Sequence, residues 1–510
     1  MTTDTSYEDI PYENYAFPGT HPNRLAGLLR LAGGTAAAPA TARVLELGCA
    51  AGANLLPMGV ELPHARFVGV DLSAGQVAAG EALRRQAGID NVEFRCANVM
   101  DIDGDWGRFD YILMHGLYSY VPPVVQDKLL AICRDHLAPG GGAYVGFNVL
   151  PGWHFNAGVR EMLIDHVAAE PAIARRPARA REFLAFLAAH APQDARGQQI
   201  RELAKRLESR PDAYLYHEYL ESENRPIRFG EFMKKAQAHG LRHVGESALS
   251  PLGIERLPPP MRDAIVGMAG DDPLRREQLI DDLTGRTLRC ALLTTADSAA
   301  RPTPRAECLD LLHIATIVRL DGPPVAVMDT IDQALVLSDG RKIRLTTASA
   351  VYRAAFGLLV AASPQAIAFD DLLARARALS QSQAGVDDDR RTLRANLLEA
   401  FHHGIIEPLA EPWRCGEPGE RPAASALARA QATAGQGITT LHHKQLFPPP
   451  KVREMIPLMD GARSVAQLVD AVLPTMPAAP GMDAQAHRAG VGRDFANVLA
   501  YLRGHGLFAG

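Results

Sequence analysis

Two patterns of apolar and polar positions alternate along residues 43–147. Short, continuous apolar runs such as RVLELGC (43–49) are typical of strands that are buried on both faces. Segments of helical period such as AGQVAAGEALRRQAG (74–88) lie between them. This order predicts a parallel sheet covered by helices on both faces. The other predicted strands are FVGVDLS (67–73), NVEFRCANV (91–99), FDYILMHG (109–116) and GGAYVGFNVL (141–150), and LAPGGG (137–142) is predicted to end a helix and turn into the last strand.

The pattern changes after Pro151. Residues 152–210 are rich in Ala and Arg and have a helical period without strand signals, which predicts an inserted helical unit. The segment 229–247 then gives a helix, a glycine stop and a strand, and TLRCALLT (287–294) is a plausible last strand of the same sheet.

The C-terminal half carries a degenerate internal repeat after PTPRAE (302–307), which is predicted to be a linker. Residues 355–409 and 455–510 each predict a helix, a short connection, another helix and a final helix that ends in His-Gly and two apolar residues. This order is similar to that of winged-helix modules. The Pro-, Ala- and Gly-rich stretch 415–437 between them is predicted to be a flexible connection.

Composition excludes several classes of protein. A chain of 510 residues with 47% hydrophobic and 22% charged residues predicts several globular domains. The net charge of −5 gives no case for a nucleic-acid or anionic-membrane partner. The cysteines form no C-x-x-C pair, and His402-His403 and His442-His443 are adjacent pairs that cannot both face one site, so no metal centre is predicted. The N-terminus lacks a signal-peptide pattern and the most apolar run (354–362) is too short for a membrane span, so we expect a cytoplasmic protein.

The segment VLELGCAAGANL (44–55) predicts a ligand site at a strand-to-helix turn. Only small residues separate Gly48 from Gly52, so a ligand can approach the backbone at the start of the helix. The G-x-G-x-x-G pattern of NAD sites is absent, and the acidic Glu46 is unfavourable beside a pyrophosphate. A carboxylate suits a cationic ligand such as the ammonium of S-adenosylmethionine, and acid–x–Gly–x–small–x–Gly is the first motif of class I methyltransferases, with Ala50 in place of the usual middle glycine.

The ends of the next strands supply further candidates. Asp71 ends the second strand, where a carboxylate accepts both ribose hydroxyls, although NAD enzymes use the same device. Asn98 ends the third strand, where an amide can meet the adenine amino group.

MHGLYSYVPP (114–123) follows the fourth strand, and two interpretations remain open for it. Tyr118 and Tyr120 are either core residues of a turn or the wall of an acceptor pocket, which the ligand side of an open α/β sheet favours. His115 is a base, a core histidine or a neighbour of the adenine.

These stretches resemble a family of bacterial methyltransferases that carry a methyltransferase regulatory domain, among them the rickettsial-type outer-membrane-protein lysine methyltransferases. The resemblance is carried by YEDIPYENYAFPGTHPNRLAGL (7–28), ELGCAAGANLLPM (46–58), FVGVDLSAGQ (67–76), MHGLYSYVPPVVQDKLLAIC (114–133) and NVLPGWH (148–154). YLYHEYLESENRPIRFGEFMKKAQAHGLRHVGES (214–247) and LTGRTLRCALL (283–293) resemble the regulatory region. Ala53 stands where glycine is often found, and Tyr120 replaces a common tryptophan.

The resemblance implies an α/β fold with a Rossmann-like, seven-stranded class I methyltransferase sheet, a helical insertion and C-terminal winged-helix-like α+β domains. The implied domains are an N-terminal lid (1–42, with Tyr12, Tyr15, Phe17 and His21), the S-adenosylmethionine-binding core (43–150), a helical insertion that forms a homodimer contact (151–212), the rest of the core with the regulatory region (213–297), and winged-helix-like domains at 298–415 and 416–510. The implied cofactor residues are Glu46, Gly48, Cys49, Gly52, Asn54, Asp71, Leu72, Gln76, Asn98, Val99 and His115, and the implied catalytic residues are Tyr118, Tyr120, Trp153 and Tyr12.

The implied function is methyl transfer from S-adenosylmethionine to lysine side chains of a protein, including an outer-membrane protein before its export. Lysine has a pKa of about 10.4 and must lose a proton before attack, which an aromatic pocket beside a sulfonium cation promotes by desolvation and like charge. Two alternatives stay open: methylation of a small molecule or envelope glycolipid, and a regulatory protein that binds the cofactor without transferring methyl groups.

Overall fold

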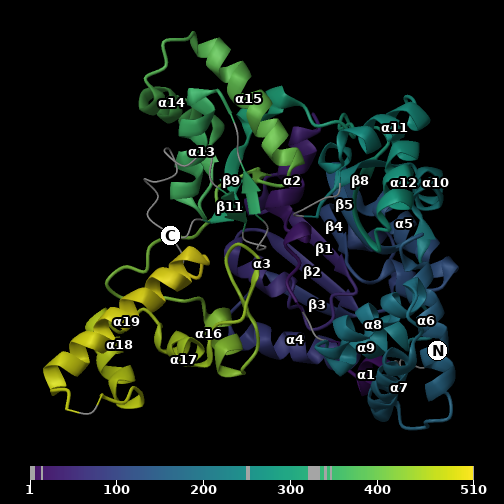
Figure 1. Cartoon of the computed structure of the whole chain (residues 1–510), viewed down its shortest axis with the longest axis horizontal. Coiled ribbons are helices and arrows are strands. Elements are labelled where there is room, and N and C mark those ends of the chain that lie inside the picture. The colour runs from purple at the N-terminus through teal and green to yellow at the C-terminus, as the bar shows by residue number, and fades with distance from the viewer. Residues whose placement is uncertain are drawn as a thin grey trace.

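The predicted sheet lies at the centre of the molecule (Figure 1). The computed structural model describes residues 6–12, 15–248, 253–319, 334–337, 342–344, 347–479 and 481–508. The strands follow the order β3-β2-β1-β4-β5-β8-β7, and a short β6 pairs with the end of β5. All of the neighbouring pairs are parallel except those that β8 makes with β5 and β7. The bounds are β1 (Arg43–Leu47), β2 (Arg66–Asp71), β3 (Val92–Cys96), β4 (Phe109–Met114), β5 (Leu137–Leu150), β6 (Ile227–Arg228), β7 (Leu241–Glu246) and β8 (Leu288–Thr295).

Helices cover both faces of the sheet because successive strand residues point to opposite sides. Val44 packs in one core with α2 (Pro22–Leu31) and α3 (Leu55–Glu61). Its neighbour Leu45 packs in the other core with α5 (Pro123–His136) and α10 (Phe229–Ala238). The α/β architecture with a class I methyltransferase type of sheet is therefore confirmed.

The start of β5 differs from the sequence prediction. Residues 137–142 do not form a separate turn but belong to β5, which begins at Leu137. Phe109 of β4 pairs with Leu137 and Tyr111 pairs with Gly142, so β5 inserts extra residues opposite Asp110. Gly140, at φ +76°, adopts the conformation that this bulge requires.

Helices fill the predicted insertion. They are α6 (Trp153–Val167), α7 (Arg176–His190) and α8 (Ala195–Glu208), followed by α9 (Asp212–Tyr219). Residues on α6, α7, α8 and α9 share one hydrophobic core. The short helix α1 (Ser6–Asp9) lies beside this group in Figure 1.

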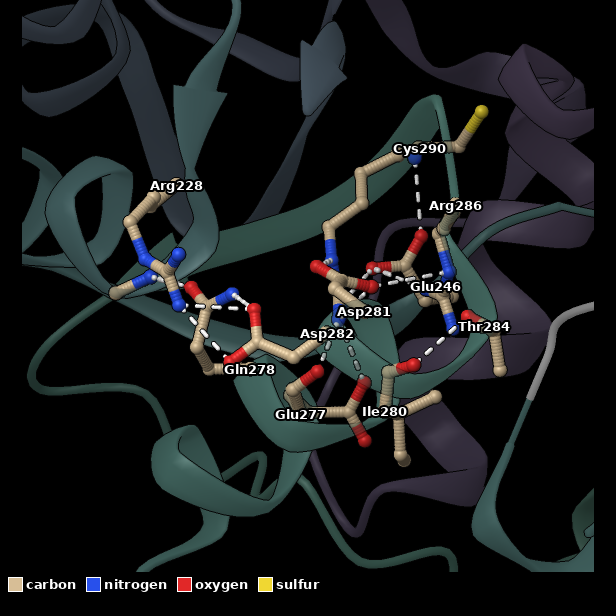
Figure 2. Close-up of polar contacts among 12 residues, drawn as sticks. Arg228, Glu246, Glu277, Gln278, Ile280, Asp281, Asp282, Thr284, Arg286 and Cys290 are labelled. Atoms are coloured by element: carbon tan, nitrogen blue, oxygen red, sulfur yellow. Dashed lines mark hydrogen bonds and ion pairs between the residues drawn. The ribbon is translucent and has the colours of Figure 1, made fainter. Parts of the chain in front are cut away.

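A buried ion network attaches α12 (Pro273–Thr284) to the β7–β8 edge, and α11 (Pro259–Ala269) packs on α12. The side chain of Arg289 on β8 is fully buried and pairs with Asp281 at 2.8 Å and Glu277 at 3.1 Å, and also with Glu246. Figure 2 shows that Glu246 of β7 and Glu277 and Asp281 of α12 converge on one region. Charges buried in this way are tolerated only when they are paired, and this network pairs them between β7, β8 and α12.

The C-terminal half contains the repeated helices. α13 (Ala350–Ala362), α14 (Phe369–Ser380) and α15 (Val386–His402) accompany the sheet β13-β9-β14, formed by Ile367–Ala368, His313–Thr316 and Ile406–Leu409. A further antiparallel sheet contains β10 (Val318–Arg319), β11 (Ala334–Leu337) and β12 (Lys342–Arg344). The second copy contains α17 (Pro450–Met455), α18 (Val465–Val472) and α19 (Ala484–Gly504). In both copies a glycine with positive φ, Gly404 or Gly506, ends the last helix.

The stretch 415–437, predicted to be a flexible connection, is instead packed. It contains α16 (Ala426–Thr433), which contacts α3 and α4 (Ala74–Gln86). Leu427, Ala428 and Ala432 of this helix are buried. Among the described helices, none is long and apolar enough to cross a membrane.

Candidate functional site

The turn between β1 and α3 is built on left-handed backbone positions. Gly48, Ala50 and Gly52 have φ values of +74°, +45° and +73°. A Cβ atom on Gly52 would lie 2.2 Å from the Phe94 ring, so this position excludes every other residue. The turn therefore brings backbone close to any ligand at the carboxyl edge of the sheet. The side chain of Cys49 packs into the core, so Cys49 contributes only its backbone.

Ala50→Gly is expected to stabilise the protein. The left-handed conformation costs an alanine about 1–2 kcal/mol, and glycine removes this cost while losing about 0.5–1 kcal/mol of conformational entropy. The midpoint of thermal unfolding should rise. Ala53→Gly is the matched control because Ala53 has no positive φ, and its midpoint should fall. Equal shifts in both variants would contradict the strain at Ala50.

Glu46 lies at the end of β1, below this turn, and is buried. Its Oε1 accepts a hydrogen bond from Asn54 Nδ2 at 2.7 Å, whereas Oε2 is buried without a hydrogen-bond partner among the described residues. Burial raises the pKa of Glu46 to about 8, with a smaller contribution from Asp71, while the Asn54 hydrogen bond opposes this rise. A buried carboxyl oxygen without a hydrogen-bond partner fits a ligand that carries an ammonium group.

Asp71 ends β2 beside the same turn. Its Oδ2 accepts a hydrogen bond from Ala50 N at 2.8 Å, and its Oδ1 accepts one from Ser73 N at 2.9 Å. Each carboxylate oxygen keeps a further lone pair for hydroxyl donors. Burial raises the pKa of Asp71. Of its neighbours, Leu72 is exposed and Gln76 is buried near the start of α4.

Asn98 has a local partner after β3. Its Oδ1 accepts a hydrogen bond from Met100 N at 3.0 Å, so the side chain caps the short helical turn that begins at Val99. The NH₂ group of the same Asn98 amide takes no part in this hydrogen bond. The carbonyl oxygen that a ligand amino group would use is therefore shared with the backbone.

His115 follows β4 and is held between two aromatic residues. Its Nδ1 lies 2.7 Å from the Tyr144 hydroxyl, and its ring stacks on Phe17 with centroids 3.7 Å apart. Burial lowers the pKa of His115 to about 4, so the imidazole is neutral at pH 7. A neutral, stacked ring suits a scaffold or a flat ligand surface better than a general base.

The N-terminal segment covers the turn. Phe17 N donates a hydrogen bond to Asn54 Oδ1 at 3.0 Å. The Thr20 hydroxyl donates to Phe17 O at 2.8 Å and lies 3.1 Å from Asn54 Oδ1. Glu8 Oε1 accepts one from Gly75 N at the start of α4 at 3.3 Å. His21, at the start of α2, lies 3.3 Å from the Glu61 carboxylate on α3.

Tyr118 does not lie where the acceptor hypothesis placed it. Its ring is fully buried and makes edge contacts with Phe147 and Phe232 in the core that α5 and α10 cover. The expectation that Tyr118 lines a pocket is therefore wrong, and the core interpretation holds for this residue. The reason is the short helical turn over Tyr118–Tyr120, which sends residues two positions apart in different directions.

Tyr120 lies in a polar cluster. Its hydroxyl donates to Glu218 Oε2 on α9 at 2.6 Å and accepts from Asn148 Nδ2 on β5 at 3.0 Å. Asn148 Nδ2 also donates to Asn224 Oδ1 at 3.1 Å, and Asn224 Nδ2 donates to the Glu218 carbonyl oxygen. Burial raises the pKa of Glu218, and the hydrogen bond from Tyr120 opposes this rise.

The charge of the Glu218 carboxylate acts on several tyrosines. Burial together with the nearby Glu218 carboxylate raises the pKa values of Tyr7 and Tyr12. For Tyr7 the charges of Glu221 and Asp71 add to this rise, and its ring stacks on His217 of α9 with centroids 4.2 Å apart. Trp153 is buried and packs on Tyr219, 5.9 Å between ring centroids. Other tyrosines whose pKa Glu218 helps to raise are Tyr120, Tyr214 and Tyr219.

Sequence reasoning missed two residues of this region. Glu218 has a detectable signal, since Tyr214 and Glu218 lie four positions apart and share one helix face. His443 of the C-terminal domain has none: its Nε2 lies 2.7 Å from Asn54 Oδ1, 389 positions away in the chain. The described residues contain no group of three or more His, Cys, Asp or Glu side chains that could hold a metal ion.

Comparisons with known proteins agree with this geometry. Residues 44–141 match the family "Methyltransferase domain", residues 211–295 match "Predicted methyltransferase regulatory domain", and residues 420–478 match "PKMT, C-terminal winged helix domain". The fold is similar to that of PKMT2 from Rickettsia typhi in complex with AdoHcy, with a TM-score of 0.85 and 25% identity over 98% of this chain and 100% of that one.

Two proteins of Rickettsia prowazekii (strain Madrid E) are similar in sequence. RP789 is 36% identical over 293 residues, which are 57% of this chain but only 53% of RP789. RP028 is 34% identical over 238 residues, which are 46% of this chain and 95% of RP028. Together with the matched domains, this similarity shows that the chain belongs to the S-adenosylmethionine-dependent class I methyltransferases that carry a methyltransferase regulatory domain.

Proposed function

We propose that the protein transfers methyl groups from S-adenosylmethionine to lysine side chains of a protein substrate. The observation that carries this proposal is the buried Glu218 carboxylate, which accepts a hydrogen bond from the Tyr120 hydroxyl and raises the pKa values of neighbouring tyrosines. A carboxylate among aromatic rings attracts a primary ammonium group by charge and by cation–π contact. A neutral or anionic acceptor group would not pair with the Glu218 carboxylate.

Glu218 would then act on the proton of the acceptor amine. In a site closed to water, burial lowers the pKa of the amine and raises that of the carboxyl group, so the proton passes from the ammonium nitrogen to a Glu218 oxygen. Tyr120 and Tyr12 would orient the free amine through their hydroxyls, and Trp153 would support the cluster through Tyr219. Tyr118 has no part in this assignment.

The turn would hold the cofactor. Bound S-adenosylmethionine supplies a methyl group that is already activated for displacement. Glu46 would pair with its ammonium group and Asp71 with its ribose hydroxyls, while Gly48 and Gly52 leave room at the backbone. Asn54, Asn98 and His115 would border it.

The protein nature of the acceptor is supported by similarity to Rickettsia typhi PKMT2 over nearly the whole chain. We propose that the protein acceptor is an outer-membrane protein, which is methylated before its export. Methylation of a metabolite or glycolipid, and cofactor binding without transfer, are the alternatives to be tested.

The test is to incubate the protein with methyl-labelled S-adenosylmethionine and separate cytosolic, outer-membrane and small-molecule fractions of a lysate. We expect label in protein that is recovered as methyl-lysine after acid hydrolysis, enriched in the outer-membrane fraction. Label confined to small molecules or lipids would overturn the acceptor assignment. Cofactor binding without any transfer would overturn the enzymatic proposal itself.

A further inference from the structure

A hairpin of the C-terminal domain ends in the cofactor region. It consists of β15 (Ile438–Thr439), β16 (Gln445–Leu446) and the turn between them, and we call residues 438–446 the C-terminal hairpin. A hairpin tip usually faces solvent. Here the tip residues Leu441, His442 and His443 are buried.

The hairpin is anchored on two sides. His442 Nε2 lies 2.8 Å from Cys415 Sγ, and Leu441 N donates to Gly506 O at 2.9 Å. Gly506 permits this approach, since a Cβ atom there would lie 2.3 Å from the His442 ring. His443 adopts φ +54° and donates its backbone N–H to Thr440 O at 2.9 Å. A histidine with positive φ is uncommon, so the surrounding packing fixes the direction of this side chain.

Hydrogen-bond directions follow from Asn54. Its Nδ2 donates to Glu46 Oε1, and its Oδ1 accepts the backbone N–H of Phe17. His443 Nε2 is 2.7 Å from the same oxygen and must therefore donate. Burial lowers the pKa of His443 well below its ordinary value, so the ring is neutral and its Nδ1 is an acceptor.

Two buried atoms thus stand without hydrogen-bond partners among the described residues on either side of Asn54: the acceptor nitrogen His443 Nδ1 and the carboxyl oxygen Glu46 Oε2. The donors on Oδ1 prevent the Asn54 amide from turning over. If it did turn over, its carbonyl oxygen would face the Glu46 carboxyl group and would repel the ionised form that pairs with an ammonium ligand. In its present orientation, the Asn54 hydrogen bond lowers the pKa of Glu46 against the larger rise that burial causes.

We propose that His443 is a positioning residue for the methyl donor: by donating to Asn54 Oδ1, it holds the Asn54 amide toward Glu46 and makes the C-terminal domain part of the cofactor site. The partner of Glu46 is the amino group of the cofactor's methionyl end. This inference relies on the cofactor assignment and is independent of the acceptor. It also assigns the C-terminal winged-helix domain a role in cofactor binding that does not involve nucleic acid.

The test compares His443→Ala with His443→Gln, because the glutamine amide can place a donor where Nε2 lies. Affinity for S-adenosylhomocysteine is measured by calorimetry between pH 6.5 and 8.5. We expect His443→Ala to bind about tenfold or more weakly at pH 7 and His443→Gln to stay within about threefold of the native chain. In His443→Ala the pH at which affinity levels off should move upward, because Glu46 loses an oriented donor.

A double-mutant cycle separates positioning from packing. In an Asn54→Ala background, His443→Ala should cause no further loss of affinity, because its effect passes through Asn54. Equal losses with and without Asn54 would overturn the proposal. So would a loss that is the same at every pH and is not rescued by His443→Gln, since that is the result of a hairpin that only packs.

Discussion

Glu46→Gln is expected to weaken cofactor binding by about 100-fold and to abolish the proton release that accompanies binding. The native carboxyl group has a pKa of about 8 because it is buried, so most of it is protonated at pH 7 in the free protein. Pairing with the ammonium group of the ligand requires the carboxylate, and binding must expel close to one proton. A charge-assisted hydrogen bond contributes about 1.5–3 kcal/mol, which is roughly a 10- to 100-fold change in affinity, and the loss of the charge itself adds to this.

The sign of the pH dependence follows from this raised pKa. Below about pH 8 the affinity of the native protein should rise by up to about tenfold per pH unit as Glu46 ionises, and it should level off above that pH. Calorimetry with S-adenosylhomocysteine in buffers of different ionisation enthalpy measures the released protons. The Glu46→Gln variant reports the titration of the ligand alone. The matched control is Glu93→Gln, which removes an exposed carboxylate on β3 and should leave proton release and affinity as in the native chain. Proton release that persists in Glu46→Gln would show that another group pairs with the ligand.

Glu218→Gln is expected to reduce turnover by about 100-fold at pH 7.5 while the affinity for S-adenosylhomocysteine stays within about twofold of native. The amide keeps the shape and the hydrogen bond with Tyr120 but cannot take the proton of the acceptor amine. General-base groups contribute about 10²–10⁴-fold. Because hydroxide removes the same proton in bulk solution, the deficit should shrink by up to about tenfold per unit of increasing pH.

The matched control for Glu218→Gln is Asp212→Asn on the same helix, whose side chain is 61% exposed and pairs with Arg181. Its turnover should be native at every pH. A deficit in Glu218→Gln that does not change with pH would mean that Glu218 binds the amine without accepting its proton. A parallel loss of cofactor affinity would instead assign the tyrosine cluster to the cofactor site.

Turnover also separates the two proposals. The effect of Glu218 should appear in kcat or in KM for the acceptor, whereas the effect of His443 should appear in cofactor affinity. If no acceptor is methylated, the Glu218 proposal fails, and the calorimetric tests of Glu46 and His443 remain decisive on their own.

The local pattern of apolar residues and motif positions was sufficient to predict the sheet and the turn between β1 and α3. Continuous apolar runs predict buried strands, and parallel strands bring their carboxyl ends to one edge, so Glu46 and Asp71 could be placed together from their positions in the sequence. The left-handed Ala50 likewise follows a motif position that is usually glycine. Each of these inferences depends on residues that are close in the chain or on neighbouring strands.

Only the tertiary structure decided which aromatic residues face which side and which distant segments complete the site. Tyr118 and Tyr120 lie two positions apart, yet a single helical turn sends one ring into the core and the other hydroxyl to Glu218. Glu218 is 98 positions from Tyr120, and His443 is 389 positions from Asn54. Periodicity reports which side of an element is apolar, but it does not identify the element that will cover a polar group. Those partners are chosen by how α9 and the C-terminal hairpin pack.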